Sequence, residues 1–332
     1  MGDPAGIGPE VVVKALLRPE PHDLAVPVVL ADPGVMERTA RDIVGCDMKI
    51  RVIANPAGAE GGPGVMNVLP IPGPDLAGVV PGRVDPRCGD AAFESVRMAI
   101  ELAMRGEIDG TVTAPLNKEA MNLAGHHYDG HTELYAHFTG TSDYTMMLAD
   151  GKLRIVHVST HVPMTRVPEF ITVERLLTVM RLGRDACLKL GLTAPRIGVA
   201  GYNPHAGENG LFGREELDVI APAVETARKE GIDATGPFPP DSVFAKAAGG
   251  GFDMVVAMYH DQGHIPLKML SFRYDGATGT WSGMTGVNIT LGLPIVRSSV
   301  DHGTAFENAG KNISSPESMI NAIEYGAMLS AR

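Results

Sequence analysis

Short runs of apolar residues alternate along the chain with longer segments in which apolar residues recur at helical spacing. The apolar runs predict β-strands at residues 26–31, 111–113, 153–159, 196–201, 254–259 and 295–298. The periodic segments predict helices at residues 9–18, 90–105, 173–190, 215–229 and 316–329. Several of the strands are apolar throughout, which is typical of strands covered on both faces. The alternation predicts an α/β protein with a mostly parallel sheet.

Local signals mark several ends and connections. Thr172 and Gly191 flank one predicted helix and are typical helix caps. Residues 55–75 are rich in Gly and Pro and predict an irregular connection. The glycine-rich turn at residues 2–8 leads into a helix, and such a turn normally follows a strand. That strand is missing ahead of Gly2, which leaves open whether it precedes the given sequence or the start was assigned late.

Composition narrows the class of protein. Among 332 residues, Lys and Arg number 28 and Asp and Glu number 39, so the formal net charge is −11. A hydrophobic fraction of 44% predicts a folded chain of one large or two medium domains rather than a disordered one. The acidic balance argues against a nucleic-acid partner, which needs clustered Lys and Arg.

Cysteine usage and hydropathy indicate the compartment. Cys46, Cys88 and Cys187 are too widely spaced for a zinc ribbon or a disulfide framework, which favours a reducing environment. No apolar run approaches the roughly 18 residues of a membrane span, and the N-terminus lacks the pattern of a secretory signal. The sequence therefore predicts a soluble cytoplasmic protein with no membrane partner.

Three histidines follow three of the predicted strands at matching points. They are His161, His205 and His260. Because ligands bind outside the carboxyl ends of strands in open parallel sheets, these side chains are expected to converge. With Asp241 or Asp261 nearby, they suit a divalent transition metal that keeps an open position. Packing or hydrogen bonding better explains any single one of the eleven histidines, but three at matching strand ends favour the metal.

A second group of residues suits an anionic ligand. Thr132, in the segment Gly-His-Thr-Glu, is placed to cap a helix and to bind an anion there. Arg297 can hold a carboxylate or phosphate through two hydrogen bonds. For each residue taken alone, a surface salt bridge is the competing interpretation. Neither glycine-rich segment is the spaced dinucleotide fingerprint, and residues 249–251 favour a helix exit over a phosphate cradle.

Eight segments distributed along almost the whole chain match a known family pattern. They are Gly-Asp-Pro-Ala-Gly-Ile-Gly-Pro-Glu (2–10), Thr-Ala-Pro-Leu-Asn-Lys (113–118), Gly-His-Thr-Glu (130–133), Ser-Thr-His (159–161), Asn-Pro-His-Ala-Gly-Glu (203–208), Met-Tyr-His-Asp-Gln-Gly (258–263), Val-Asn-Ile-Thr-Leu-Gly-Leu-Pro (287–294) and Asp-His-Gly-Thr-Ala (301–305). On these residues the chain resembles the 4-hydroxythreonine-4-phosphate dehydrogenase family, a relative of the isocitrate and isopropylmalate dehydrogenases.

The resemblance implies an architecture. The fold would be two α/β/α domains around a cleft, as in isocitrate and isopropylmalate dehydrogenases. Residues 1–120 and 295–332 would form the first domain, which carries the NAD loop. Residues 121–294 would form the second domain, with the metal site and the interface of a homodimer.

The resemblance also implies residue roles. The metal ligands would be His161, His205 and His260, holding one divalent ion (zinc, magnesium, cobalt or manganese), with His161 reaching it across the dimer interface. The substrate contacts would be His131, Thr132, Lys268, Asn288 and Arg297. The NAD contacts would be His302, Gly303, Thr304, Ala305 and Asn312. The candidate catalytic groups are Lys268, Asp241 and Asp261, and the sequence does not identify the general base among them.

Some details resemble a sister branch, the D-threonate or D-erythronate 4-phosphate dehydrogenases. They are the segments at residues 209–213, 239–244 and 262–268. Between Lys268 and Asn288 the chain also carries more residues than the family pattern, including Tyr274-Asp-Gly-Ala-Thr-Gly-Thr-Trp281. Gly and Asp here predict a hairpin-like excursion between two expected substrate contacts.

These features predict NAD- and metal-dependent oxidation of a 4-phosphorylated 3-hydroxy acid, followed by decarboxylation. The candidate substrates are 4-phosphooxy-L-threonine, D-threonate 4-phosphate and D-erythronate 4-phosphate. Lys268 would assist proton transfer or steady developing negative charge. Two alternatives stay open: a metal-dependent phosphatase or aldolase acting on sugar phosphates, and a ligand-binding homologue without activity.

Overall fold

The chain forms two compact units. Unit 1 comprises Met1–Ser142, Ser282–Val287 and Leu293–Arg332, and unit 2 comprises Asp143–Trp281 and Asn288–Gly292. The structure, a computed structural model, describes residues 1–277 and 280–331. The chain enters unit 2 later than the expected boundary near residue 120, because the two helices that follow this point pack against a helix of unit 1.

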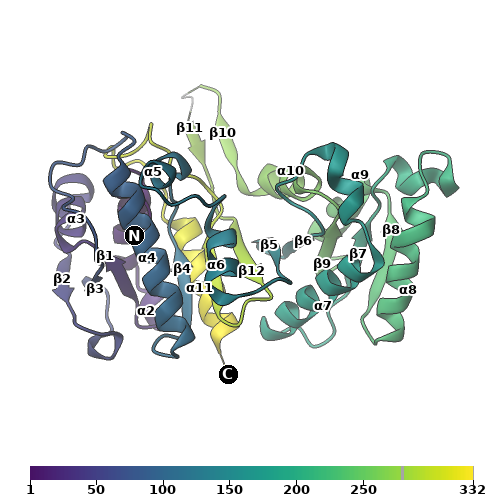
Figure 1. The fold of residues 1–332 in the computed structure, drawn as a ribbon, viewed down its shortest axis with the longest axis horizontal. Coiled ribbons are helices and arrows are strands. Elements are labelled where there is room, and N and C mark those ends of the chain that lie inside the picture. The colour runs from purple at the N-terminus through teal and green to yellow at the C-terminus, as the bar shows by residue number, and fades with distance from the viewer. Residues whose placement is uncertain (278–279, 332) are drawn as a thin grey trace. The chain divides into compact units, whose positions relative to one another are not determined.

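Unit 1 contains parallel strands flanked by helices (Figure 1). The strands β1 (Val28–Ala31), β2 (Lys49–Val52) and β3 (Val65–Pro70) pair in the order β1-β3-β2, and β4 (Gly110–Thr113) pairs in parallel with β13 (Val296–Val300). The helices are α1 (Gly8–Leu16), α2 (Glu20–Leu24), α3 (Pro33–Arg38), α4 (Pro86–Met104), α5 (Lys118–Leu123), α6 (His131–Thr139) and α11 (Glu317–Ser330). Shorter helical turns are η1 (Thr39–Val44) and η2 (Pro56–Gly58).

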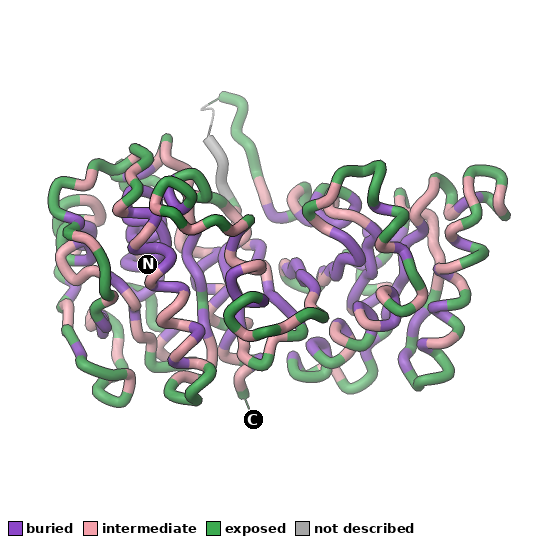
Figure 2. Tube along the Cα trace, in the orientation of Figure 1, coloured by how far each residue is buried: buried purple, intermediate pink, exposed green. Residues whose placement is uncertain are grey.

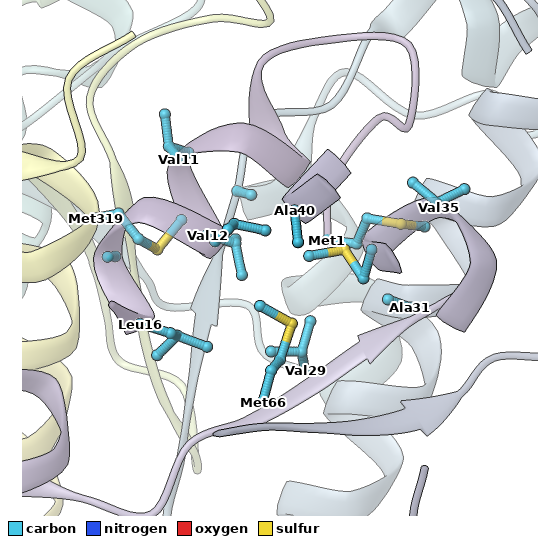
Figure 3. Close-up of a cluster of buried hydrophobic side chains, with 14 of the residues drawn as sticks. Met1, Val11, Val12, Leu16, Val29, Ala31, Val35, Ala40, Met66 and Met319 are labelled. Carbon is cyan, nitrogen blue, oxygen red and sulfur yellow. The ribbon is translucent and has the colours of Figure 1, made fainter. Parts of the chain in front are cut away.

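Alternate side chains of the unit 1 strands bury on opposite faces. Val29 of β1 and Met66 of β3 pack in one cluster with α1, α3 and α11, and Figure 3 shows them gathered with Val12 and Leu16. Leu30 and Leu69 instead pack with α4 in a second cluster. Because successive strand residues point to opposite faces, unit 1 is a three-layer α/β/α arrangement.

Unit 2 is built on one mixed sheet. Its strands are β5 (Thr145–Asp150), β6 (Leu153–His157), β7 (Ile197–Ala200), β8 (Ala234–Phe238), β9 (Met254–Ala257) and β12 (Val287–Leu291), whose residues from Asn288 on belong to this unit. Their order is β12-β5-β6-β9-β7-β8. β5 and β6 pair antiparallel, whereas the pairs β6–β9, β9–β7 and β7–β8 are parallel. The helices are α7 (Val173–Lys189), α8 (Ala221–Lys229), α9 (Pro240–Ala248) and α10 (His260–Ser271), with helical turns η3 (Met164–Phe170), η4 (Pro204–Gly210) and η5 (Glu216–Ile220).

Helices cover both faces of the unit 2 sheet. α7 and α8 lie on one face, whereas α9 and α10 lie on the other. Ile155, Val255 and Leu267 join the cluster under α9 and α10. Figure 2 shows many strand segments of each unit buried, such as β9 and β7, and the outer helix faces exposed. Each unit thus has its own core, and the predicted α/β class is confirmed.

Every strand and helix predicted from the pattern is present, with ends shifted by a few residues. The cap at Thr172 is confirmed, since its hydroxyl accepts a hydrogen bond from Arg175 N at 3.1 Å. Gly191 has a φ of +89°, as a residue that ends a helix requires. The helix exit at residues 249–251 is also confirmed, because α9 ends at Ala248.

One prediction for this region was wrong. Residues 55–75 were expected to be irregular, yet they contain the buried strand β3. Gly and Pro surround the short apolar run Val65–Pro70 and conceal its strand pattern. By contrast, the excursion after Lys268 is a strand pair, β10 (Arg273–Asp275) with β11 (Thr280–Ser282), as its Asp and Gly predict.

The structure also describes the cysteines and the hydropathy of the helices. All three cysteines are free thiols, and burial raises the pKa of Cys88 to about 12 and that of Cys187 to about 11. Among the described residues, no helix combines the length and hydropathy needed to cross a membrane.

Candidate active site

Three neighbouring strands of unit 2 place the predicted metal-binding histidines at one edge. β6, β9 and β7 are adjacent and parallel, and their carboxyl ends lead to His161, His260 and His205 respectively. The ends of β6 and β9 are tied together, since Ser159 Oγ donates to Met258 O at 2.9 Å. The expectation that three strand ends present these histidines at one edge of the sheet matches this topology.

Two buried polar side chains fix the backbone under these loops. Gln262 is 7% exposed, accepts from Met258 N at 2.7 Å and donates to Gly201 O at 2.8 Å, so it joins the ends of β9 and β7. Glu216 is 2% exposed and accepts from the backbone N–H groups of Tyr202 and Asn203, each at 2.7 Å. Buried groups satisfied in this way specify a single loop conformation.

The loop that carries His205 has an unusual backbone. Residues 205–209 all have positive φ, including His205 at 53° and Glu208 at 43°. For residues other than glycine, the left-handed region costs roughly 1–2 kcal/mol each. The hydrogen bonds that Glu216 accepts at the start of the turn offset part of that strain. Backbone strain held by its surroundings is typical of functional loops.

The rings of His161 and His260 are neighbours, with centroids 5.7 Å apart and planes inclined by 41°. Asp261 Oδ1 lies 2.7 Å from His260 Nδ1, which favours a proton on Nδ1 and leaves the Nε2 lone pair available. His205 is exposed and its ring lies 6.3 Å from that of Phe212. Across residues 1–277 and 280–331, no three His, Cys, Asp or Glu side chains are close enough to hold a metal ion.

Two further imidazoles lie behind His260. His264 stacks on His260 with ring centroids 3.6 Å apart, and the ring of buried His157 lies 5.0 Å beyond it. Burial lowers the pKa of His157 to about 3 and that of His264 to about 4. Gly263 permits this packing, since a Cβ there would lie 2.4 Å from His157 Nε2.

Lys268 and Asn288, two expected substrate contacts, also belong to unit 2. Lys268 lies two turns after His260 on α10, with its Nζ 5.4 Å from the centre of the Phe272 ring. Asn288 Nδ2 donates to Met146 Sδ at 2.8 Å. Asp241 is exposed in the first turn of α9. Of the three candidate catalytic groups, Asp261 is therefore the one in contact with a predicted metal ligand.

A buried guanidinium occupies unit 1. Arg297 of β13 is 3% exposed, donates from Nη2 to Thr113 Oγ1 at 2.9 Å, and lies 5.6 Å from the Tyr135 ring centre. Burial lowers the pKa of Arg297 to about 10, so the side chain stays charged at neutral pH. Burial also raises the pKa of Tyr135, which therefore stays protonated. A buried cation beside hydroxyl groups suits an anionic ligand.

His131 lies near this guanidinium at the start of α6. Burial, and then the charge of Arg297, hold the pKa of His131 well below its usual range, so the ring is neutral. Its Nε2 is shielded from water and finds no hydrogen-bond partner among the described residues. The predicted cap at Thr132 was wrong: α6 begins at His131 and its N-cap is Gly130, with a φ of +155°. The cap position needs the positive φ of Gly130, which is strained for a residue with a Cβ. Thr132 therefore lies in the first turn of α6.

The predicted NAD loop also lies in unit 1. Ala305 and Asn312 have φ values of 41° and 58°, and His302 Nδ1 lies 3.1 Å from Gly303 O. His302 Nε2 is buried and has no partner among the described residues, and burial lowers the pKa of this ring. The backbone around Gly303 is open, because nothing lies within 4 Å of a Cβ built there.

The glycine-rich turn at residues 2–8 supports this loop. Ile7 N donates to Thr304 O at 3.0 Å, and a Cβ at Gly6 would lie 3.0 Å from Thr304 Cβ. Asp3 is fully buried and accepts from Ala5 N at 2.8 Å, and burial raises its pKa to about 6. The turn therefore allows close backbone packing, which explains its glycines without a dinucleotide fingerprint.

A cavity of about 730 Å³ also lies in unit 1, lined by β1, β4, α4 and α11. Of the lining strands, β1 pairs with β3 and β4 pairs with β13. The lining is mainly apolar, and Glu107 and Asp109 are among its charged residues. Thr113, which accepts a hydrogen bond from Arg297, and His131 also line this mainly apolar cavity.

The chain is similar to proteins of known name over its full length. Residues 23–326 match the family described as Pyridoxal phosphate biosynthetic protein PdxA. The chain is 46% identical to the D-threonate 4-phosphate dehydrogenase of Pectobacterium atrosepticum, over 99% of this chain and 97% of that protein. It is 45% identical to the 4-hydroxythreonine-4-phosphate dehydrogenase of Desulforapulum autotrophicum, over 99% of this chain and 93% of that protein.

The fold agrees with the sequence similarity. The crystal structure of a 4-hydroxythreonine-4-phosphate dehydrogenase from Klebsiella pneumoniae superimposes with a TM-score of 0.84 at 44% identity, covering 100% of this chain and 98% of that one. The fold and these similarities define an α/β protein related to dehydrogenases of phosphorylated hydroxy acids. The chain belongs to the PdxA family, which confirms the resemblance predicted from its motifs.

Sequence reasoning missed several supporting residues. Gln262 and Glu216 hold the backbone near the histidines that were predicted to bind a metal, while Thr113 and Tyr135 contact Arg297. Thr113 and Gln262 lie inside segments that matched the family pattern, so the motifs contained a signal for them. Glu216 and Tyr135 lie outside those segments, in helical positions that predict ordinary packing.

Proposed function

We propose that this protein oxidises and decarboxylates a 4-phosphorylated 3-hydroxy acid, with NAD as oxidant and one divalent metal ion. The observation that carries the proposal is the buried Arg297, charged at neutral pH and beside Thr113 and neutral His131. These residues form a setting for an anionic group of the substrate. The chain is about equally similar to a D-threonate 4-phosphate dehydrogenase and to a 4-hydroxythreonine-4-phosphate dehydrogenase.

The donor set of unit 2 fits a divalent transition metal. His161, His205 and His260 would hold it, and the Asp261–His260 contact supports this assignment because a proton held on Nδ1 leaves the Nε2 lone pair free for a metal. Bound there, the metal would polarise the hydroxyl and stabilise negative charge on oxygen. NAD, held by His302, Gly303, Thr304, Ala305 and Asn312, would accept the hydride. The open backbone at Gly303 supports that position for the cofactor.

The remaining steps fall to the chain's own side chains. His131, Thr132, Asn288 and Arg297 bind and orient the substrate, and Arg297 neutralises one of its anionic ends. We assign proton transfer to Lys268 Nζ, because this lysine shares a face of α10 with His260. Asp261 orients His260 and does not itself exchange a proton with substrate. Asp241 is kept as a candidate base.

We further propose that the enzyme works as a homodimer in the cytoplasm. The family resemblance implies that the partner's His161 completes the metal site, whereas the rings of His161 and His260 within one chain already lie 5.7 Å apart. Large apolar side chains are exposed in unit 2, at Leu211 (72%), Ile265 (61%) and Met269 (77%). Exposed apolar residues of this size are typical of an interface between subunits. Sedimentation analysis of the purified protein tests this part.

The experiment that tests the function measures NADH formation by the metal-supplemented protein. 4-Phosphooxy-L-threonine, D-threonate 4-phosphate and D-erythronate 4-phosphate are offered in parallel, and carbon dioxide release is followed. Turnover of 4-phosphooxy-L-threonine alone would indicate pyridoxal phosphate synthesis. Turnover of the two sugar acids alone would indicate sugar-acid catabolism. Release of inorganic phosphate or cleavage products without NADH would contradict the proposal and favour a phosphatase or aldolase. Addition of a chelator is expected to abolish NADH formation.

A further inference from the structure

His264 has a close and regular contact with His260 that the proposed mechanism does not use. The two residues lie four positions apart on α10, so their side chains leave the same face of the helix. Their rings are stacked, with centroids 3.6 Å apart and planes inclined by 13°.

The ring of His264 is itself held from several sides. His264 is 7% exposed, and its Nδ1 lies 2.8 Å from His260 O, which fixes the rotation of the ring. Behind it lies the ring of His157, at 5.0 Å, from a residue that is fully buried at the end of β6. His264 is thus a rigid surface, anchored to the sheet, against which His260 packs.

The geometry separates a supporting role from a ligand role. A metal ion binds an imidazole in the ring plane, along the nitrogen lone pair, at about 2.0–2.1 Å. Two nearly parallel rings 3.6 Å apart have no common point that satisfies this for both. His264 and His260 therefore do not chelate one ion, although histidines four apart on a helix can do so when their planes converge.

We propose that His264 is a positioning residue that holds the ring of His260 for metal binding, an inference that rests on the proposed metal site. Asp261 accepts a hydrogen bond from His260 Nδ1 and so fixes which nitrogen is free. His264 fixes the tilt of the ring through the stack. With the protonated nitrogen and the ring tilt both fixed, His260 Nε2 points in one direction before a metal ion arrives. Metal binding then costs less side-chain conformational entropy.

The test is a titration of metal-free protein with Co²⁺, followed by visible absorption and by competition with a chromophoric chelator. His264→Leu removes the stacked ring and is expected to weaken Co²⁺ binding about 10- to 100-fold, the usual effect of losing a residue that orients a metal ligand. His264→Phe keeps a flat ring and is expected to restore affinity to within about 3-fold of the parent, since the stack persists. His126→Leu is the matched control, because His126 also stacks on a ring, Phe93 at 3.7 Å, but lies in unit 1.

The outcomes separate this inference from the proposed function. Loss of Co²⁺ binding in His260→Ala, with the expected effects at position 264, supports both. Loss in His260→Ala with unchanged binding in His264→Leu overturns the positioning role alone. Unchanged binding in His260→Ala overturns the metal site itself. If His264→Phe binds as poorly as His260→Ala, the ring nitrogen is a ligand and the positioning role is wrong. Thermal melts of the metal-free variants show whether each is folded.

Discussion

The two units place their candidate functional residues in opposite settings. In unit 1 the key group is itself buried: Arg297 is 3% exposed, hydrogen-bonded to Thr113 and covered by Tyr135. In unit 2 the key groups are exposed, as His161 and His205 are, and the buried residues are those beneath them. A desolvated cation attracts an anion strongly, whereas a metal site must admit both an ion and a substrate. Burial suits the first task, and rigid support under open side chains suits the second.

The largest expected effect comes from removing the buried charge of unit 1. Arg297→Met is expected to cost about 2 to 5 kcal/mol of substrate binding, or roughly 30- to several thousand-fold in kcat/KM. The same variant is expected to melt at the same temperature as the parent or higher, since a buried charge replaced by an apolar side chain of similar length often stabilises a protein. NADH kinetics and thermal melts check both parts. Normal kinetics in Arg297→Met would show that the buried cation does not bind the substrate.

The energetic cost of burying charge in unit 1 is measurable at Asp3. Its folded pKa is raised by burial from 3.8 to about 6. Between these values the unfolded chain has lost the proton that the folded chain keeps, so this contribution to stability is present below pH 3.8 and lost as pH rises through 6. Asp3→Asn is expected to gain up to about 3 kcal/mol in unfolding free energy relative to the parent between pH 4 and pH 7.5.

Urea titrations at the two pH values provide this comparison. Asp47→Asn is the control, because Asp47 is exposed and should show no comparable gain. A constant difference between Asp3→Asn and the parent across the pH range would show that Asp3 ionises normally in the folded protein.

Rigid support in unit 2 is tested at Gly263. A Cβ there would lie 2.4 Å from His157 Nε2 and 2.8 Å from Ile155 Cγ2. Ala normally stabilises a helix by about 1 kcal/mol relative to Gly, but overpacking a core costs about 1–3 kcal/mol. Gly263→Ala is therefore expected to destabilise the protein by up to about 2 kcal/mol net. Gly276→Ala is the control, since nothing lies within 4 Å of a Cβ at that position. Equal stability of both variants would mean that the His157 ring can move aside for a Cβ at position 263.

The smallest expected effect concerns the strand pair β10–β11. Replacing residues 274–281 by a short glycine linker should leave the melting temperature nearly unchanged, because Tyr274 and Asp275 are exposed. If the excursion contributes to substrate choice, the ratio of kcat/KM values among the three candidate acids should change by about 10-fold or less. An unchanged ratio would assign selectivity to the residues of the two units alone.

The sequence predicted what depends on local pattern and failed where contacts are distant. Apolar runs located β6, β7 and β9, and the parallel-sheet rule then placed His161, His205 and His260 at one edge. β3 was missed because its six residues are flanked by Gly and Pro, and the cap of α6 because the backbone of Gly130 decides it. The carboxylate of Glu216 acts on residues far from it in sequence, and no local pattern reveals that.

His264 illustrates the same limit within the candidate site. It stands in a segment that matched a sister branch, yet its spacing from His260 predicts only a shared helix face. Whether two histidines four apart chelate an ion or stack depends on the rotamers that the surroundings select. The buried His157, which lies against Gly263, is part of those surroundings and comes from another strand.

The single side chain of Gln262 has a consequence for thermal motion. It bonds to Met258 N and to Gly201 O, so displacement of one strand end is transmitted to the other. The two loops that start there then fluctuate together, and the distance between them varies less than the position of either. His205 and His260 can thus keep a nearly constant separation, because the segments that carry them share Gln262 as an anchor.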